Sequence, residues 1–404
     1  MKKPKIRFKG FTETWEQRKL GELVGIYDGV HQTPDYQDSG IMFLSVENIA
    51  TLKSEKYIAV EAFERDYKVY PEKGDILMTR IGDVGTTNVV ETVEKVAFYV
   101  SLALLKPNRI DSYFLSNAMK TNVFQKGLRE RTLVTAIPQK INKDEIGKID
   151  IFITNNDEEQ KKIGAYFSNL DHLITLHQRQ CENLKKLKKF MLQKLFPQNG
   201  ENVPEIRFSN FTDTWEQRKL EEICESFEYG LNAAAKEYDG ENKYIRITDI
   251  DDNSHEFIQD DVTSPDIDLT NSENYQLKYG DVIFTRTGAS VGKTYIYKES
   301  DGLVYYAGFL IRGRVKSNYS PEFIFQNTLT DDYDKFIRIT SQRSGQPGVN
   351  AQEYASYEIS VPKFEEQQKI GAYFSTLDHL ITLHQSKCDK LIEVKKYMLQ
   401  NMFI

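Results

Sequence analysis

The chain is poor in cysteine and contains no long apolar run, and these two absences exclude several classes of protein. Its 404 residues include only three cysteines, Cys181, Cys224 and Cys388, with no CxxC pair among them. A disulfide framework and a cysteine zinc site are therefore both unsupported. No stretch approaches the ~20 consecutive apolar residues that span a bilayer, so we expect a cytoplasmic chain with no membrane partner.

Metal-binding and catalytic signatures are scarce as well. The pairs His172/His177 and His379/His384 are five residues apart, whereas a helical metal pair requires a spacing of about three or four. None of the 11 prolines adjoins another, which excludes the Asn/Asp-Pro-Pro-Tyr/Phe motif of methyltransferases that act on exocyclic amines. No serine or cysteine nucleophile with histidine and carboxylate partners emerges. We therefore predict that the chain is not an enzyme and that it binds no metal or other cofactor.

One segment imitates a phosphate-binding loop. Residues 288–294 read GASVGKT, but only three residues separate the two glycines, where the motif requires about four. The matching segment at residues 82–85, GDVG, has no lysine. We interpret both segments as turns between strands.

The net charge of −7 is unevenly distributed along the chain. Residues 197–364 contain 29 acidic and 17 basic residues, a net charge of −12, whereas residues 158–196 contain four acidic and eight basic residues, a net charge of +4. Much of the acidity lies between Asp249 and Glu273. We interpret it as a solvated surface turned away from any phosphate backbone.

A duplication of about half the chain organises the sequence. FTETWEQRKL at residues 11–20 returns as FTDTWEQRKL at 211–220, and EEQKKIGAYFSNLDHLITLHQ at 158–178 returns at 365–385 with two substitutions. Between these ends the copies share little beyond GDILMTR at residues 74–80 and GDVIFTR at 280–286. Matched ends with divergent middles indicate a shared mechanical frame that carries two different recognition surfaces.

Two long helices are predicted at residues 158–196 and 365–404. Apolar residues recur there at alternating spacings of four and three, which is the heptad pattern of a coiled coil. The order domain, helix, domain, helix favours antiparallel packing, because parallel helices would force the chain back along a full helix length. We predict an α+β fold with globular domains at residues 1–157 and 197–364 in tandem, separated by two antiparallel coiled-coil helices and related by a pseudo-two-fold axis.

A second apolar row flanks the heptad seam and is wider than a two-stranded coil requires. These residues either cover the flanks of the domains themselves or dock helices of partner subunits at two equivalent sites. The row consists of Tyr166, Leu173, Leu187, Tyr373, Leu380 and Val394.

Two groups of polar residues are candidates for contact with DNA. The first lies in the glycine-containing turn after each Gly-Asp strand, where amides, hydroxyls and cations suit phosphate contacts; for its two matched arginines a structural ion pair is the alternative. It consists of Arg80, Thr86, Thr87, Arg286, Thr287, Ser290 and Lys293. The second lies in divergent segments, where Arg can contact guanine and Gln adenine; for each of its members a solvent-exposed loop without DNA contact is the alternative. It consists of His31, Gln32, Thr33, Arg129, Arg131, Thr132, Thr135, Gln139, Arg338, Ser341, Gln342, Arg343 and Gln346.

The order of these motifs across essentially the whole chain resembles that of the specificity subunits of type I restriction-modification enzymes. The resemblance rests on WEQRKLGEL at residues 15–23, on the Gly-Asp strand with its glycine turn, and on VPKFEEQ at 361–367 followed by KIGAYF. Copy one departs from the pattern at residues 154–157, where copy two has Pro362. The resemblance implies two target recognition domains that each read one half of a bipartite, asymmetric site in double-stranded DNA.

The resemblance also implies partners for the chain. Two methylation subunits would dock on the helices, and two restriction subunits would join for cleavage. S-adenosylmethionine, ATP and Mg²⁺ would then be bound by these partner subunits. The alternative is a duplicated scaffold that binds only proteins and makes no direct DNA readout, and the acidic second domain favours it.

Overall fold

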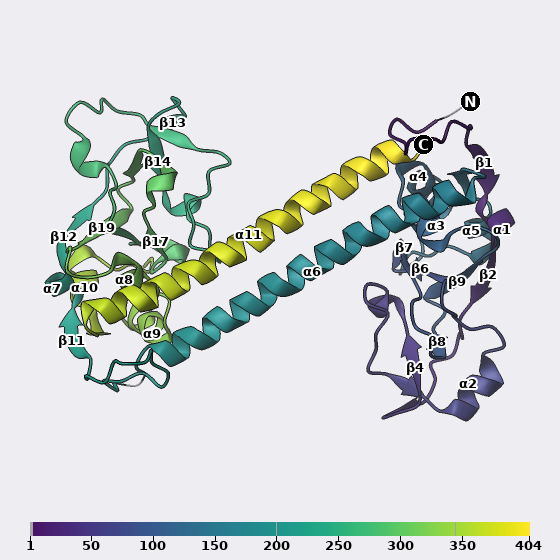
Figure 1. Ribbon diagram of the computed structural model, residues 1–404, viewed down its shortest axis with the longest axis horizontal. Coiled ribbons are helices and arrows are strands. Elements are labelled where there is room, and N and C mark those ends of the chain that lie inside the picture. The colour runs from purple at the N-terminus through teal and green to yellow at the C-terminus, as the bar shows by residue number, and fades with distance from the viewer. Residues whose placement is uncertain (1–2, 199, 344) are drawn as a thin grey trace. The chain divides into compact units, whose positions relative to one another are not determined.

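The computed structural model describes residues 3–198, 200–343 and 345–404, and it divides into two compact units (Figure 1). Unit 1 comprises residues 1–177 and 387–404, and unit 2 comprises residues 178–386. Each unit therefore contains one globular domain and a part of both long helices, α6 (Asp157–Leu195) and α11 (Phe364–Met402). Both helices begin one residue before the predicted limits, while the predicted domain boundaries themselves stay a prediction.

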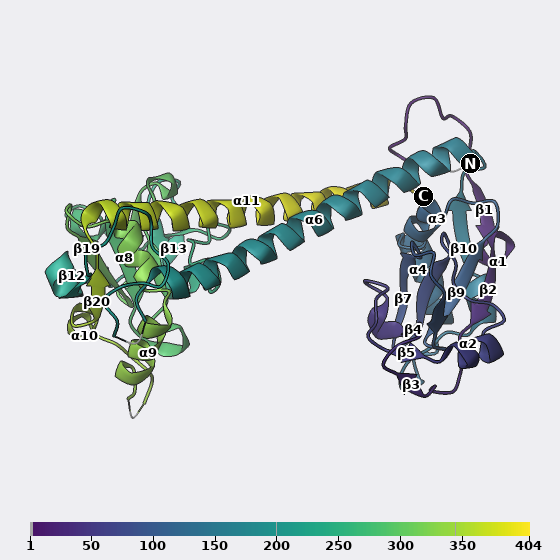
Figure 2. The same ribbon diagram turned by 60° about the horizontal axis from the view of Figure 1, so that its bottom comes forward.

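Unit 1 contains three sheets. The largest has the strand order β2-β9-β6-β7 and is antiparallel throughout. A second sheet has the order β3-β5-β4-β8 and, with helix α2, lies on the side of the unit away from α6 (Figures 1 and 2). The strands are β1 (Glu16–Lys19), β2 (Val24–Asp28), β3 (Tyr36–Gln37), β4 (Ile41–Leu44), β5 (Tyr57–Ile58), β6 (Ile76–Ile81), β7 (Asp83–Val89), β8 (Val96–Phe98), β9 (Leu102–Pro107) and β10 (Asp150–Ile153), where β1 pairs with β10. The helices are α1 (Leu20–Leu23), α2 (Val60–Asp66), α3 (Ser112–Ala118), α4 (Asn122–Arg131) and α5 (Lys143–Gly147).

Unit 2 repeats this plan. Its sheets have the orders β12-β19-β16-β17, β13-β15-β14-β18 and β11-β20. The strands are β11 (Glu216–Lys219), β12 (Cys224–Tyr229), β13 (Ala235–Glu237), β14 (Lys243–Ile245), β15 (Thr263–Pro265), β16 (Asp281–Thr285), β17 (Thr294–Ile296), β18 (Val304–Tyr306), β19 (Leu310–Val315) and β20 (Glu358–Val361). The helices are α7 (Leu220–Ile223), α8 (Pro321–Asn327), α9 (Asp331–Thr340) and α10 (Ala351–Ala355).

The Gly-Asp strands β6 and β16 are apolar on both faces because each divides two hydrophobic cores. Ile76 and Met78 of β6 lie in the core that includes the helices, whereas Leu77 lies in the core of the β4–β8 sheet. In β16, Phe284 lies in the core that includes the helices, whereas Ile283 lies in the core of the β14–β18 sheet. This explains the continuous apolar run where a half-exposed strand would alternate with polar residues.

The heptad seam packs the two long helices against each other within each unit. In unit 1 the ring of Phe167 lies 5.7 Å from that of Phe403, while Asp171 forms an ion pair with Lys395. In unit 2 the Lys188 ammonium lies 2.6 Å from Asp378. Residues later in α6 thus contact residues earlier in the segment that contains α11. The predicted antiparallel packing is confirmed. Lys188 and Lys395 occupy seam positions because each pairs with an aspartate of the other helix.

Candidate nucleic-acid interface

One edge of the large sheet in unit 1 gathers the residues predicted to contact DNA. Strands β2 and β6 both run antiparallel to β9, so their carboxyl ends, Asp28 and Ile81, lie at the same edge. Strand β7 starts there, at Asp83, after the turn at Gly82. This turn has a positive φ of 82°, which favours glycine. The candidates His31, Gln32 and Thr33 follow β2 directly and are exposed.

A loop distant in sequence completes this edge. The backbone of Gly82 and Gln139 is joined by a hydrogen bond of 2.9 Å, and the Gln139 side chain donates to the Gly82 carbonyl at 3.0 Å. The amide of Ile141 donates to the Arg80 carbonyl at 3.0 Å. The structure therefore brings together the turn after β6 and the loop at residues 132–140, which the sequence analysis treated as separate candidates.

Unit 2 builds the same edge from different residues. The amide of Gly288 donates to the Pro347 carbonyl at 3.0 Å, and the amide of Val349 donates to the Arg286 carbonyl at 2.9 Å. The segment that imitated a phosphate-binding loop forms a turn between β16 and β17, as predicted. Each unit thus presents a turn and a loop side by side, and the two pairs differ in sequence.

The matched arginines of the two turns have different environments. Arg80 is buried and forms an ion pair with Asp28, and burial lowers the pKa of its guanidinium. Arg286 is half-buried and stacks on the Tyr229 ring at 4.8 Å. Arg80 therefore has the structural ion pair that was the alternative to phosphate contact, and Arg286 is the more accessible of the two.

Two further members of the predicted phosphate group are already bound within the chain. Thr87 is buried, and its hydroxyl lies 3.0 Å from that of Ser116. The ammonium of Lys293 donates to the Ile250 carbonyl at 2.7 Å and to Asp252 at 2.6 Å.

Other turn residues remain accessible. Thr86 is exposed, while Thr287 and Ser290 are half-buried. These three hydroxyls and Arg286 form the part of the predicted phosphate group that is open to a ligand.

The acidic stretch of unit 2 reaches this edge. Asp252, which is 80% exposed, forms the ion pair with Lys293, so the stretch is not wholly turned away from the turn, contrary to our expectation. Elsewhere it is partly neutralised by cations of neighbouring segments, because Asp249 pairs with Arg246 and Glu256 with Lys298.

The base-reading candidates differ in exposure. Arg131 donates to the Gly127 carbonyl at 3.2 Å and Thr132 to the Leu128 carbonyl at 2.8 Å, so both are partly committed to helix α4. Ser341 is buried. The remaining candidates of the two loops are exposed, namely Arg129, Thr135, Gln139, Arg338, Gln342, Arg343 and Gln346.

Three exposed apolar residues in the first loop escaped the sequence analysis. Leu133, Val134 and Ile137 are 46%, 68% and 100% exposed. They lie between the polar candidates that we selected, and the signal that could have found them is a group of large apolar side chains beside Pro138 in an otherwise polar segment.

The second apolar row on the helices divides into two sets. Tyr166 and Tyr373 pack on their own domains, with ring distances of 6.2 Å to Phe8 and 6.3 Å to Phe208. Leu380 is half-buried, whereas Leu173, Leu187 and Val394 are exposed.

Besides the two tyrosines and the residues of the seam itself, four positions on the helices carry a large apolar side chain that is at least partly exposed in both copies. In α6 they are Leu173, Leu176, Leu187 and Phe190, and in α11 Leu380, Leu383, Val394 and Tyr397. Each of these residues comes one position before a residue of the heptad seam, so all lie on the same flank of their helix. The seam residues concerned are Ile174, His177, Lys188 and Met191 in α6 and Ile381, His384, Lys395 and Met398 in α11.

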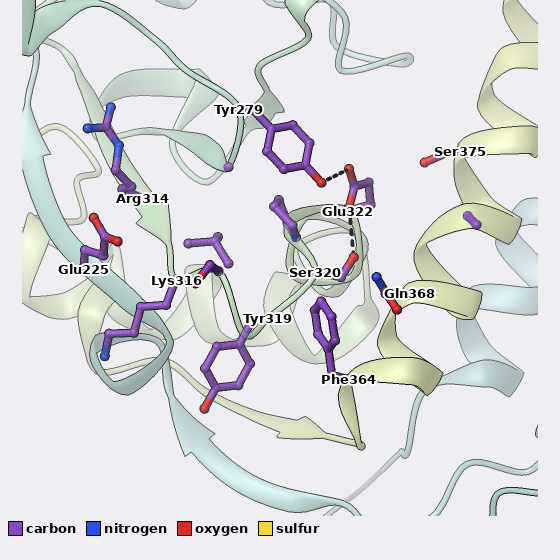
Figure 3. A pocket seen from close by; sticks show the side chains of 15 residues that line it. Glu225, Tyr279, Arg314, Lys316, Tyr319, Ser320, Glu322, Phe364, Gln368 and Ser375 are labelled. Atoms are coloured by element: carbon purple, nitrogen blue, oxygen red, sulfur yellow. Dashed lines mark hydrogen bonds between the residues drawn. The ribbon is translucent and has the colours of Figure 1, made fainter.

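A cavity of about 720 Å³ lies elsewhere in unit 2, lined in part by Tyr279, Arg314 and Gln368 (Figure 3). Tyr279 donates to Glu322 at 3.2 Å across it. Arg314 is near the carboxyl end of β19, while the amino end of β19 pairs with Thr285 beside the candidate interface. The cavity therefore lies at the opposite edge of the sheet and is not part of the interface.

Within the described residues, no helix is long and apolar enough to cross a membrane. Among the same residues, no group of three or more His, Cys, Asp or Glu side chains is placed to hold a metal ion.

Residues 12–186 and 212–393 match the family model of the type I restriction modification DNA specificity domain, with one match in each copy. The chain belongs to this family. The resemblance recognised in the sequence is confirmed, and so is the α+β fold of two tandem domains with the long helix α6 between them. As a family member the chain is a non-catalytic specificity subunit, whose general role is DNA recognition.

Individual relatives are distant, and two of them span nearly the whole chain. The type I restriction enzyme MjaVIII specificity subunit of Methanocaldococcus jannaschii is 22% identical over 407 residues, which cover 95% of this chain and 91% of the relative. The putative type I restriction enzyme MjaX specificity subunit of the same organism is 23% identical over 211 residues, 50% of this chain and 48% of the relative. The crystal structure of a type I restriction-modification S subunit from M. genitalium shares the fold with a TM-score of 0.67 at 15% identity, over 100% of this chain and 99% of that one.

Proposed function

We propose that this specificity subunit reads a bipartite, asymmetric site in double-stranded DNA, one half per domain. The observation that carries the proposal is the matching sheet edge of the two units. Each edge joins a turn to a loop from a distant part of the chain, Gly82 to Gln139 in unit 1 and Gly288 to Pro347 in unit 2. Because the frame is shared while the exposed side chains differ, the two edges suit two different half-sites.

Within each edge, the accessible hydroxyls and Arg286 would contact phosphates, and the exposed loop residues would contact bases. Thr86 in unit 1 and Thr287 and Ser290 in unit 2 are the hydroxyls concerned. Arg80, Thr87 and Lys293 would instead support the turns, because their side chains are buried or nearly so and are bound to partners within the chain.

We further propose that two methylation subunits dock on the exposed apolar flanks of α6 and α11. The duplication creates two equivalent sets, and apolar side chains in matched positions on helices suit the packing of partner helices.

Two restriction subunits would join for cleavage. The methylation subunits would bind S-adenosylmethionine and flip an adenine out of each half-site, and ATP and Mg²⁺ would be bound by the partners. We expect this DNA-acting complex in the cytoplasm.

The test is to co-express the chain with the methyltransferase of its system, purify the complex and map methylated adenines by sequencing. The proposal predicts one motif with two different halves and a fixed spacer. A complex that assembles but methylates no specific motif would instead support a scaffold that binds only proteins, the alternative that the acidic second domain favours.

Docking has its own test. Leu173→Asp with Leu176→Asp, and separately Leu380→Asp with Leu383→Asp, should each remove one methylation subunit, measured as stoichiometry by native mass spectrometry. Val93→Asp is the control, because Val93 is 85% exposed and belongs to the loop after β7 rather than to either long helix. Full occupancy in both double variants would contradict the docking proposal.

A further inference from the structure

The loop at residues 132–140 of unit 1 presents large apolar side chains to solvent. Ile137 is fully exposed, and Val134 and Leu133 are 68% and 46% exposed. Scattered apolar side chains on a surface are ordinary, but a group of them in one short loop marks a binding feature.

The backbone of this loop is held in place. The amide of Leu133 donates to the Lys140 carbonyl at 2.8 Å, so that the loop closes on itself. Gln139 is bonded to Gly82 through both its backbone and its side chain, at 2.9 and 3.0 Å. The apolar side chains are therefore presented by a fixed loop fastened to the candidate nucleic-acid interface.

The charge around the loop indicates a polyanionic partner. Residues 126–140 contain four basic residues and one acidic residue, a net charge of +3. Among the basic residues, Arg129 and Lys140 are exposed at the base of the loop. A partner that attracts these cations and also buries apolar side chains is more consistent with DNA than with an apolar protein surface.

The alternation of side chains in the loop fits one groove of DNA. Polar Thr132, Thr135 and Gln139 lie among apolar Leu133, Val134 and Ile137. The major groove presents hydrogen-bonding groups together with the 5-methyl group of thymine, whereas the minor groove has no methyl group.

The corresponding loop of unit 2 has a different chemistry. Pro347 makes there the hydrogen bond to the turn that Gln139 makes in unit 1. Residues 341–348 read SQRSGQPG and contain no large apolar side chain besides the proline. Apolar contact made through this loop is therefore a property of unit 1 only.

We propose that Leu133, Val134 and Ile137 read thymine through its 5-methyl group in the major groove of the half-site that belongs to the first domain. This inference rests on the proposed function. It predicts that the half-site of the first domain contains at least one thymine that is recognised by its methyl group.

The experiment uses the complex with its methyltransferase and duplexes of the mapped site. Deoxyuridine, which lacks the methyl group, replaces thymine in one half-site at a time. Binding to one half-substituted duplex should weaken about fourfold per contacted thymine, the factor expected for one buried methyl group. The double variant Val134→Ala, Ile137→Ala should bind the thymine duplex more weakly and should show a smaller difference between it and the deoxyuridine duplex, because only Leu133 is left to contact the methyl group. Val93→Ala is the matched control and should keep the full difference.

The outcomes separate this inference from the function on which it rests. Equal binding of thymine and deoxyuridine duplexes, with scrambled DNA still rejected, would overturn the inference and leave the proposed function intact. Failure to reject scrambled DNA would overturn the proposed function. A double variant that keeps the full deoxyuridine penalty would show that the loop does not read the methyl group. A double variant that no longer assembles with the methyltransferase would assign the loop to a protein partner instead.

Discussion

At the scale of single residues, the matched ends of the two copies form the same ion pair, an arginine with a buried glutamate. Arg7 contacts Glu159 through Nε at 2.5 Å and Nη2 at 2.8 Å, and Arg207 contacts Glu366 in the same bidentate way at 2.7 and 2.8 Å. The side chains of Glu159 and Glu366 are 0% and 1% exposed. Each pair fastens the start of a domain to the start of its long helix.

Removal of Arg7 should therefore destabilise unit 1. Arg7→Ala leaves a buried carboxylate without its cation, and we expect the free energy of unfolding to fall by about 2–3 kcal/mol. The measurement is calorimetric or denaturant unfolding. Arg65→Ala serves as the control, because Arg65 pairs with Asp66 on the surface and its loss should leave stability unchanged. Equal stability of the two variants would refute the role of the buried pair.

His255 makes the stability of unit 2 depend on pH. Burial is the largest cause that lowers its pKa from the ordinary value, and Lys188 and Lys293 lower it further. The Thr294 carbonyl, 2.8 Å from Nδ1, and Asp378 act in the opposite direction. Because the unfolded chain takes up this proton more readily, the contribution to stability is complete above the unfolded pKa of about 6.5 and is lost as the pH falls below it.

We expect the native chain to lose more stability between pH 7.5 and pH 5.5 than the variant His255→Asn. Asparagine is chosen because His255 has a positive φ of 58°, which asparagine tolerates. Burial raises the pKa of Asp334, and the imidazole that this carboxyl also faces acts to lower it, so the same comparison is repeated in an Asp334→Asn background, where this carboxyl cannot titrate. Denaturant midpoints at the two pH values measure the difference, and parallel losses would contradict the assignment to His255.

At the scale of secondary-structure elements, the glycine of the repeated KIGAYF motif has a steric reason. A Cβ atom on Gly164 of α6 would lie 2.3 Å from the Asp111 carboxylate and 2.9 Å from the Phe114 amide. Asp111 caps helix α3 by accepting from that amide at 2.8 Å. The glycine therefore allows the capped end of α3 to pack directly on the long helix.

Gly164→Ala should destabilise the chain although alanine favours helices by about 1 kcal/mol. We expect a net loss of about 1–3 kcal/mol from overpacking. Gly371→Ala should lose less, since its Cβ would lie 2.9 Å from the Glu322 side chain and 3.0 Å from Ser320 Oγ. Asn169→Ala, at an exposed position of α6, reports helix propensity alone and should not destabilise. Thermal unfolding compares the three, and a stabilised Gly164→Ala would contradict the close packing.

The long helices could be predicted from sequence because their heptad pattern is local. The candidate interface could be predicted only in part. The pairing of Gly82 with Gln139 depends on contacts between segments 57 residues apart, which no local pattern reveals. The same holds for the partners that remove Arg80 and Lys293 from the surface, Asp28 and Asp252.

At the scale of the whole molecule, we propose that the length of the long helices sets the spacing between the two half-sites. Each has 39 residues, a length of about 58 Å at ~1.5 Å per residue. The duplication means that the length of α6 and that of α11 must change together, since their seam residues pack against each other in both units.

The most direct test of bipartite reading by two domains on a helical spacer is to insert one heptad at the middle of both helices and to map adenine methylation. The insertion adds about 10.5 Å, or about three base pairs at ~3.4 Å each. If the helices set the spacing, we expect a methylated motif with unchanged halves and a spacer about three base pairs longer. A motif with the original spacer, or with altered halves, would contradict it.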